Sequence, residues 1–137
     1  MKAKRVKIWV DGASRGNPGQ AAIGVIIKDE QGKIITRISQ RIGTTTNNQA
    51  EYRAIIAALE KAIELGATHV VINSDSELVV RQLNGRYRVR KAELKPLFQK
   101  ASQLCGSLGG FTITHIPREQ NREADRLANA ALDSAVD

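Results

Sequence analysis

The sequence of 137 residues has few of the side chains that form covalent cross-links or soft-metal sites. Its single cysteine, Cys105, excludes a disulfide within the chain and a zinc site made of cysteines. His69 and His115 are the only histidines, which argues against a zinc site of mixed cysteine and histidine ligands. We therefore expect Cys105 to pack as a small apolar residue.

Aromatic residues and long apolar runs are also scarce. The chain has two Phe, two Tyr and one Trp, so its core must be built from Val, Ile, Leu and Ala. No run approaches the roughly 18 apolar residues of a membrane-spanning helix. The first residues, MKAKRVKIWVDG, lack the apolar centre and cleavage site of a secretory signal, so the expected location is cytoplasmic. Without linkers or repeats, the length suits a single domain over residues 1–137.

Positive charge is in excess, with 21 Lys and Arg against 14 Asp and Glu, a formal net charge of +7. A basic surface favours phosphate-rich partners, because binding releases the counterions condensed on them. The alternative is a solvated basic surface with no dedicated partner. Residues 81–100 hold most of the excess, since their only acid is Glu93 and their basic residues are Arg81, Arg86, Arg88, Arg90, Lys91, Lys95 and Lys100.

Apolar and polar residues alternate in the first third of the chain, which is typical of β-strands. Val6, Ile8 and Val10 establish this period, and clusters of Gly, Asn, Pro and Asp separate the strands. We expect strands at 6–10, 21–28 and 34–42, with turns at 16–19 and 29–32. Short connections between consecutive strands indicate an antiparallel meander.

Helical periodicity follows. We expect a helix capped by Thr46 or Asn47 that continues to about Leu65 and ends at Gly66. Further helices are expected at 77–83 (capped by Ser74), 92–104 and 121–132, and strands at 69–73 and 111–116. The order β-β-β-α-β-α-α-β-α includes a strand–helix–strand crossover, which implies parallel strands beside the meander. The predicted fold class is α/β, with a mixed five-stranded sheet flanked by helices.

Four acids occupy positions where a solvated carboxylate is not expected. Asp11 and Asp75 follow apolar strands, and helical spacing places Glu51 and Asp125 on inward faces. Each acid also has a purely structural alternative. In chain order, these are a turn residue, an acid that favours the positive end of its helix, a helix cap and a solvated acid of a first helical turn. No Lys or Arg shares these inward positions. Such a cluster favours Mg²⁺ or Mn²⁺, and two such ions about 4 Å apart can promote phosphoryl displacement.

Four ordered segments that carry these acids resemble the signature segments of the type 1 ribonuclease H family. They read WVDGASRGNPG, TTNNQAEYRAIIAALE, INSDSELVVRQLNG and HIPREQNREADRLANAA, and the resemblance covers nearly the whole chain. It implies a ribonuclease H-like fold and metal-dependent hydrolysis of the RNA strand of RNA–DNA hybrids. It also implies 3′-hydroxyl and 5′-phosphate products and little sequence preference. The compact form is similar to the bacterial, archaeal and plant branch of the family.

The resemblance also implies roles for single residues. Asp11, Glu51, Asp75 and Asp125 would hold two Mg²⁺ ions, with Mn²⁺ as a substitute, and Glu51 and Asp75 would help to activate water. The hybrid would be bound by Gly12, Ala13, Ser14, Asn17, Thr46, Asn47 and Asn48, with Thr46 near a DNA-strand phosphate. For Asn47 and Asn48, helix capping is the alternative. His115 is a candidate for proton transfer or product release, and Arg118 is the alternative, for charge stabilisation or product release. It is equally open that neither takes part.

Larger bacterial family members carry a basic protrusion for which the region between Leu83 and Leu94 is too short. We expect the segment NGRYRVRKAE to substitute for it in part, with Arg86, Arg88 and Arg90 on DNA-strand phosphates and Tyr87 against a sugar. A solvated basic face is the alternative. A second departure from the family pattern is that the sequence shows no N-terminal hybrid-binding domain, so we expect modest processivity.

Two other functions remain open at this point. A ribonuclease H-like fold can bind hybrids without cutting them, although a complete acid quartet argues against this. Resolvases, transposases and exonucleases also use the fold, but they place their acids differently and usually need further domains. We expect a monomer that removes RNA primers and R-loops.

Overall fold

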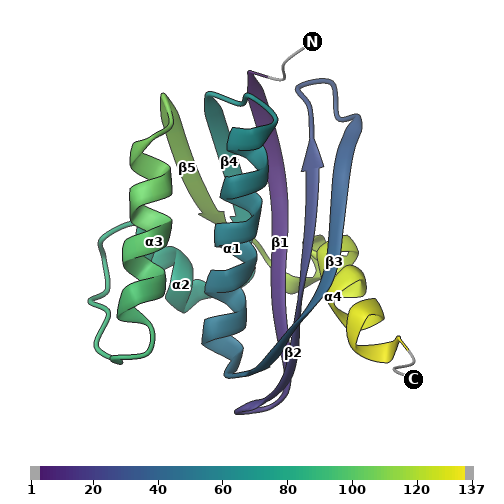
Figure 1. Ribbon diagram of the computed structural model, residues 1–137. Coiled ribbons are helices and arrows are strands. Elements are labelled where there is room, and N and C mark those ends of the chain that lie inside the picture. Colours follow the sequence, from purple (N-terminus) through teal and green to yellow (C-terminus); the bar gives the residue numbers. More distant parts are fainter. Residues whose placement is uncertain (1–3, 135–137) are drawn as a thin grey trace.

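The computed structural model describes residues 4–134, so the two ends of the expected domain, 1–3 and 135–137, lie outside it. Its centre is a five-stranded sheet in the order β3-β2-β1-β4-β5 (Figure 1). β1 pairs antiparallel with β2 and β2 with β3, whereas β1–β4 and β4–β5 are parallel. The predicted mixed sheet is therefore confirmed. The strands are β1 (Arg5–Gly16), β2 (Gly19–Lys28), β3 (Ile34–Thr45), β4 (His69–Ser74) and β5 (Gly110–His115).

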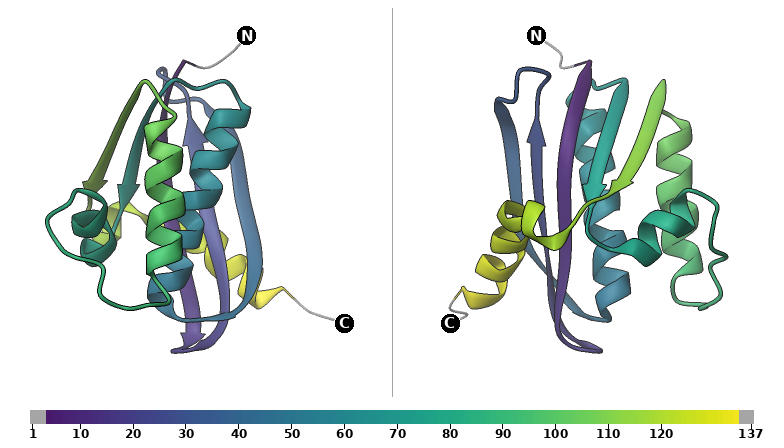
Figure 2. Two further views of the ribbon diagram at one scale, coloured as in Figure 1. Left: turned by 60° about the vertical axis from the view of Figure 1, so that its left-hand side comes forward. Right: turned by 180° about the vertical axis from the view of Figure 1, so that it is seen from behind.

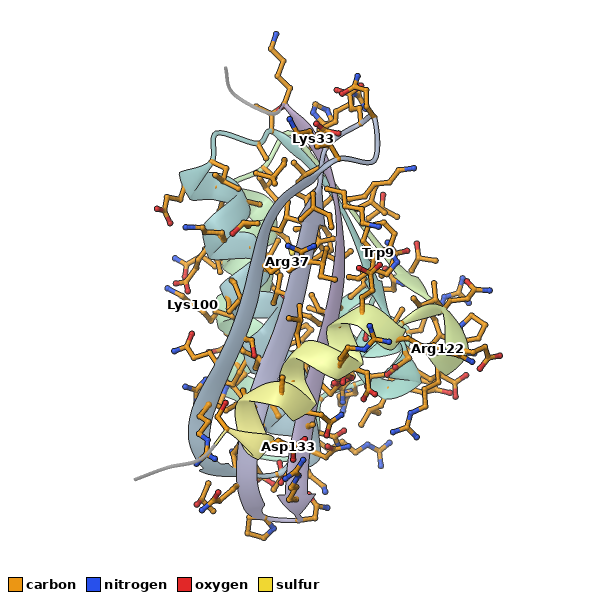
Figure 3. The ribbon with its side chains drawn as sticks, turned by 90° about the vertical axis from the view of Figure 1, so that its right-hand side faces the viewer. Trp9, Lys33, Arg37, Lys100, Arg122 and Asp133 are labelled. Carbon is orange, nitrogen blue, oxygen red and sulfur yellow. The ribbon has the colours of Figure 1, made fainter. Side chains whose placement is uncertain are left out.

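Helices cover both faces of this sheet (Figure 2). One face carries α1 (Asn47–Glu64) and, beside it, α2 (Glu77–Leu83) and α3 (Lys95–Gly106). The other face carries α4 (Arg122–Asp133), which follows a short 3-10 helix, η1 (Arg118–Gln120). Figure 3 shows α4 crossing the sheet, with Arg122 at its start and Asp133 at its end. None of the helices in the described part of the chain is long and apolar enough to cross a membrane.

The core lies between the sheet and α1 and is aliphatic, as expected. Val6, Ile8 and Val10 of β1 pack with Ile55 and Leu59 of α1, and all five are at most 2% exposed. Tyr52 is fully buried, and its hydroxyl donates a 2.6 Å hydrogen bond to the side-chain oxygen of Gln82. Cys105 is half-buried against the same core, which raises the pKa of its thiol to about 11. Its expected role as an apolar packing residue is confirmed.

Two helix starts identify their capping residues. Thr46 caps α1 in a reciprocal arrangement with Gln49, so Asn47 and Asn48 are free of the capping role that was their alternative. Ser76 caps α2, so the prediction of Ser74 was wrong. Ser74 is instead fully buried as the last residue of β4, and its hydroxyl accepts the Ser76 N–H at 3.1 Å.

Several elements differ in extent from their predicted ranges. β1 continues to Gly16 and β3 to Thr45, because each remains paired with β2 after its apolar alternation has ended. α3 begins at Lys95 rather than near Ala92, with Pro96 in its first turn, where a missing N–H costs nothing. η1 was not predicted.

Candidate active site

The acids from the sheet gather where β4 ends. The last pair between β1 and β4 is Val10 with Ser74, so Asp11 is the first residue of β1 without a β4 neighbour. Asp75 follows Ser74 directly. The parallel pairing of β1 and β4 therefore places both carboxylates at the same end of the paired strands.

Two glycines bring the helices close enough to add their acids. A side chain at Gly12 would overlap the backbone of Ala50 and Glu51, so only glycine lets α1 approach β1 this closely. The Gly12 N–H donates to Glu51 Oε1. On the other face, a side chain at Gly24, which lies opposite Asp11 in β2, would overlap the Ala124 carbonyl of α4. This contact brings the neighbouring Asp125 toward Asp11.

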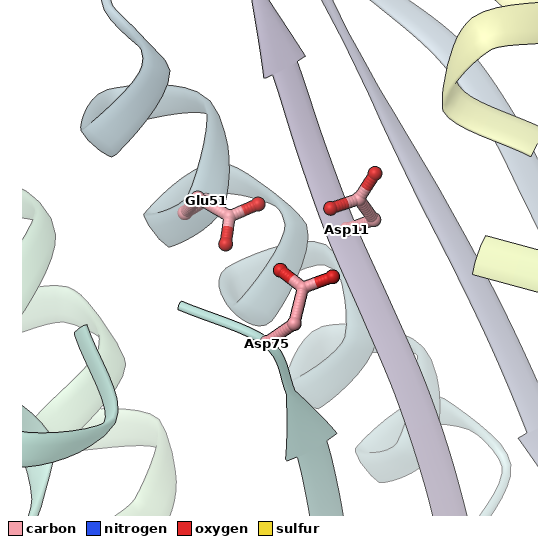
Figure 4. A group of neighbouring side chains, drawn as sticks. All are labelled: Asp11, Glu51 and Asp75. Carbon is pink, nitrogen blue, oxygen red and sulfur yellow. The ribbon is translucent and has the colours of Figure 1, made fainter. Parts of the chain in front are cut away.

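Asp11, Glu51 and Asp75 form a tight cluster in which one carboxylate oxygen of each lies within 4.8 Å of the others (Figure 4). Asp11 is 6% exposed and Glu51 5%, whereas Asp75 is half-buried. None of the ion pairs formed among residues 4–134 includes any of these three acids. Within the described residues, no Lys or Arg therefore forms an ion pair with this cluster.

The uncompensated charge shows in the titration of the two buried acids. Burial raises the pKa of Asp11 to about 8, with further contributions from the charges of Asp75 and Asp125. Burial likewise raises the pKa of Glu51 well above its usual value, and the charge of Asp11 adds to the effect. Clustered carboxylates that ionise this reluctantly are stabilised by a divalent cation, and an all-oxygen donor set suits a hard one. The residues therefore fit a divalent metal site.

Asp125 stands slightly apart from the other three acids. It is half-buried in the first turn of α4, and its charge acts on Asp11 although it lies outside the tight cluster. The Asn129 amide, one turn later, donates to the Asp125 side chain at 3.2 Å and to its carbonyl oxygen at 3.0 Å. All four predicted acids thus face a common region, three closely and one at its border.

An open cavity of about 700 Å³ surrounds the acids. Most residues predicted to bind the hybrid line it, together with Arg15, Gly16, Ser76 and Asn129, which were not predicted. The predicted hybrid-binding members are Gly12, Ala13, Ser14, Asn17, Asn47 and Asn48. Arg118, a candidate for product release, lines the cavity as well. Of the unpredicted ones, Asn129 could have been found from its position four residues after Asp125, on the same helical face.

Asparagine side chains fix the loop after Asp11 to the start of α1. Asn47 Oδ1 accepts the Ser14 N–H at 3.2 Å, and the Asn47 N–H donates to Asn17 Oδ1 at 3.0 Å. The side-chain amide nitrogens of Asn17 and Asn47 make no hydrogen bond within residues 4–134. Amide groups therefore line the cavity beside the acids with donors to spare.

The remaining predicted residues lie less centrally. Thr46 does not line the cavity, and its hydroxyl caps α1. His115, the last residue of β5, pairs in register with Ser74 but is exposed and does not line the cavity either. Arg118, in η1, is exposed and does line it. Of the two alternatives, the structure thus brings Arg118 and not His115 to the cavity.

A second groove, of about 460 Å³, contains the predicted basic segment. It is lined by Asn48, Leu78, Gln82, Arg86, Tyr87, Arg88, Arg90, Lys91 and Leu94. Asn48 also lines the acid cavity, so the two concavities meet at this residue. The Arg81 guanidinium lies 5.4 Å from the centre of the Tyr87 ring and 2.9 Å from Glu77, while the ring remains 47% exposed.

The sequence matches known proteins over almost its full length. A family model described as reverse transcriptase-like matches residues 9–131. Ribonuclease HI of Halobacterium salinarum is 44% identical over 131 residues, which are 96% of this chain and 66% of that protein. Bifunctional protein Rv2228c of Mycobacterium tuberculosis is 42% identical over 133 residues, and this chain spans 36% of its length. Ribonuclease H of Anaplasma marginale is 31% identical, with 97% of this chain and 94% of that protein covered.

Solved structures agree with these matches. The crystal structure of RNase H1 from Halobacterium salinarum superposes with a TM-score of 0.93 at 44% identity, covering 96% of this chain and 99% of that one. The crystal structure of LC11-RNase H1 in complex with an RNA/DNA hybrid gives a TM-score of 0.89 at 44% identity, covering 93% and 96%. With the fold, the order of the acids and these similarities in agreement, the chain belongs to the type 1 ribonuclease H family.

Proposed function

We propose that the chain is an endonuclease that hydrolyses the RNA strand of RNA–DNA hybrids and leaves 3′-hydroxyl and 5′-phosphate ends. One observation carries the proposal: a cluster of carboxylates that forms no ion pair with Lys or Arg opens into a cavity that asparagine side chains and the segment Gly12 to Ser14 also line. LC11-RNase H1, which is 44% identical to this chain over the aligned residues, was crystallised with such a hybrid, which supports the proposed substrate. We further propose that the chain acts as a monomer.

The four acids would hold two Mg²⁺ ions, with Mn²⁺ as a substitute. Asp11 is suited to the central position because Glu51, Asp75 and Asp125 all influence its ionisation. Bound divalent ions activate a water molecule and stabilise the leaving oxygen of a phosphoryl displacement. Glu51 is fixed by the Gly12 N–H, whereas half-buried Asp75 and Asp125 lie toward the cavity where the phosphodiester would lie.

Choice of the RNA strand would depend on the asparagines. A 2′-hydroxyl both donates and accepts hydrogen bonds, and it is the group that distinguishes RNA from DNA. A side-chain amide can complement it in either sense. Asn17, Asn47 and Asn48 line the cavity that contains the acids, so a strand that they bind lies beside the cutting site. The backbone of Gly12, Ala13 and Ser14 lines the same cavity and would contact the same strand.

The second strand would follow the basic groove. Arg86, Arg88 and Arg90 are exposed there, and Asn48 joins the groove to the acid cavity. Guanidinium groups pair well with phosphates, and the groove has no acidic lining residue. The hybrid would then bind in a single orientation, with its DNA strand in the basic groove and its RNA strand at the acids.

Cleavage of an end-labelled RNA strand within a hybrid tests the proposal. The wild type should cut it in Mg²⁺ and should not cut it in EDTA. Asp11→Asn keeps the size of the side chain but removes its charge, and it should reduce cleavage by at least a hundredfold. A folded wild-type protein that binds the hybrid but leaves the RNA intact in both Mg²⁺ and Mn²⁺ would instead be a hybrid-binding module.

A further inference from the structure

Asn121 occupies an unusual position between η1 and α4. Its side chain is 1% exposed although it belongs to a chain segment that is otherwise exposed on the η1 side. It precedes the first residue of α4, where asparagine normally caps a helix, yet its side chain makes no capping bond. Among the buried side-chain atoms of the described residues, Asn121 Oδ1 is also the one without a hydrogen-bond partner. Capping would use this same oxygen as the acceptor, so the side chain is buried at the expense of the capping hydrogen bond.

The hydrogen bonds of the Asn121 side chain are made by its amide nitrogen. Asn121 Nδ2 donates to the Val10 carbonyl oxygen at 2.8 Å and to Asp75 Oδ2 at 3.2 Å. Val10 directly precedes Asp11, so this one amide connects the Asp75 carboxylate to the strand that carries Asp11. The backbone carbonyl of Asn121 accepts the Asp125 N–H at 3.1 Å. Asn121 therefore has bonds to Asp75, to the neighbour of Asp11 and to Asp125.

We infer that Asn121 is a positioning residue that orients Asp75 relative to Asp11 and thereby sets the affinity of the site for a divalent cation. The inference rests on the proposed function only in that the acids hold such a cation. An amide suits this role because it donates a hydrogen bond without carrying charge. A Lys or Arg at the same place would hold Asp75 equally well but would neutralise the charge that attracts the cation.

The test compares Asn121→Leu and Asn121→Ala with a matched control, Asn73→Leu. Asn73 likewise donates its amide to a β1 carbonyl, that of Ile8 at 3.2 Å, but it bonds to no acid. Binding of Mn²⁺ without nucleic acid is followed by electron paramagnetic resonance of the free ion. Changing hydrogen-bond partners of metal ligands typically weakens metal binding about 10- to 100-fold, and we expect that increase in the Mn²⁺ dissociation constant for both Asn121 variants. Asn73→Leu should stay within about twofold of the wild type.

Kinetics separate positioning from general damage. For both Asn121 variants we expect kcat at low Mn²⁺ to fall about tenfold or more and to recover in part as Mn²⁺ is raised, with KM for the hybrid nearly unchanged. A loss of folded protein would instead lower the number of sites without changing the dissociation constant. Unchanged Mn²⁺ affinity in a folded Asn121 variant overturns the inference.

A measurement on the wild type removes the dependence on variants that fold. The side-chain amide resonances of Asn121 should shift during a Mg²⁺ titration, because its acceptor Asp75 changes its charge environment. Those of Asn84, which donates to the Ile113 carbonyl, should not. An unmoved Asn121 amide at saturating Mg²⁺ contradicts the inference. Because the binding and resonance experiments use no substrate, they succeed or fail independently of whether the protein cuts hybrids.

Discussion

The carboxylates of Asp11 and Asp75 lie close together at the edge of the sheet, and after burial the charge of Asp75 contributes most to raising the pKa of Asp11 to about 8. The parallel pairing of β1 and β4 enforces this closeness, because it ends at Val10 and Ser74. In the absence of cations the folded protein must keep these charges together. The fold is thus destabilised by the same arrangement that would bind metal.

Stability without metal should consequently fall as pH rises. Burial and neighbouring charge raise the pKa of Asp11 in the folded state from its ordinary value of 3.8 to about 8, so the folded state retains more protons than the unfolded state between about pH 4 and pH 8. The free energy of unfolding therefore decreases across that interval. In EDTA the midpoint temperature of thermal unfolding should be lower at pH 8 than at pH 5. Saturating Mg²⁺ should raise this temperature, and it should do so most strongly at pH 8. Thermal unfolding followed by circular dichroism measures both effects.

Asp11→Asn is the control for this dependence. Removing the charge should flatten the pH profile in EDTA and raise the midpoint at pH 8. Relief of about 1.4 kcal/mol, equivalent to one pKa unit, corresponds to a rise of about 4 °C or more in a chain of this size. A midpoint in EDTA that rises between pH 5 and pH 8 would contradict the account of the acid cluster.

Gly12→Ala should disrupt the site through packing. The added methyl group would overlap the backbone of Ala50 and Glu51, which forces α1 away from β1 and moves Glu51. We expect destabilisation of about 1–3 kcal/mol and a loss of cleavage greater than that destabilisation explains. Gly106→Ala is the matched control, since nothing lies within 4 Å of a side chain added there. Chemical denaturation and hybrid cleavage of both variants provide the comparison, and equal behaviour of the two would refute it.

Arg118 and His115 should differ in their effect on turnover. Arg118 lines the acid cavity, where its positive charge can stabilise the negative charge of the cut phosphate, whereas His115 lies outside the cavity. We expect Arg118→Ala to lower kcat at least tenfold and His115→Ala to change it less than about threefold. Steady-state kinetics on a short hybrid distinguish the two. A larger loss of kcat in His115→Ala than in Arg118→Ala would contradict this expectation. It would assign the contribution to turnover to His115, through a movement of the end of β5.

Arg88 should contribute to binding rather than to cleavage. Each phosphate contact contributes about 0.9 to the slope of log affinity against log salt concentration on B-form DNA. We therefore expect Arg88→Ala to reduce the slope by about 1 and to raise KM with little change in kcat. Arg37 is a matched control, because it is also exposed but lies on β3, at the opposite edge of the sheet (Figure 3). Equal slopes for the two variants would mean that residues 86–90 are a solvated basic face.

Local patterns were sufficient to predict the five strands, the four α-helices and the four candidate acids, but not η1. Alternation around Val6, Ile8 and Val10 marks a buried strand, and an acid directly after such a strand indicates a site at its end. The extension of β1 to Gly16 could not be predicted in this way. Its later residues are small or polar, and what keeps them extended is their pairing with β2.

The role of Asn121 was beyond the reach of local patterns for a different reason. Its partners Val10 and Asp75 are 111 and 46 residues distant in the sequence. An asparagine directly before a helix usually caps it, and only the packing of α4 on the sheet directs the Asn121 amide elsewhere. The separation of Arg118 from His115 has the same origin, because η1 carries the chain from the end of β5 past the acids.

The proposed activity is cleavage of the RNA strand of an RNA–DNA hybrid while the DNA strand stays intact. Its most direct test uses one hybrid with different labels on the two strands, incubated with the wild type in Mg²⁺ beside duplex DNA of the same sequence. The account predicts cleavage of the RNA strand alone, to fragments with 3′-hydroxyl and 5′-phosphate ends, and intact DNA in both substrates. Cutting of the DNA strand at a comparable rate would contradict it, because the asparagine-lined cavity would then not select for the 2′-hydroxyl.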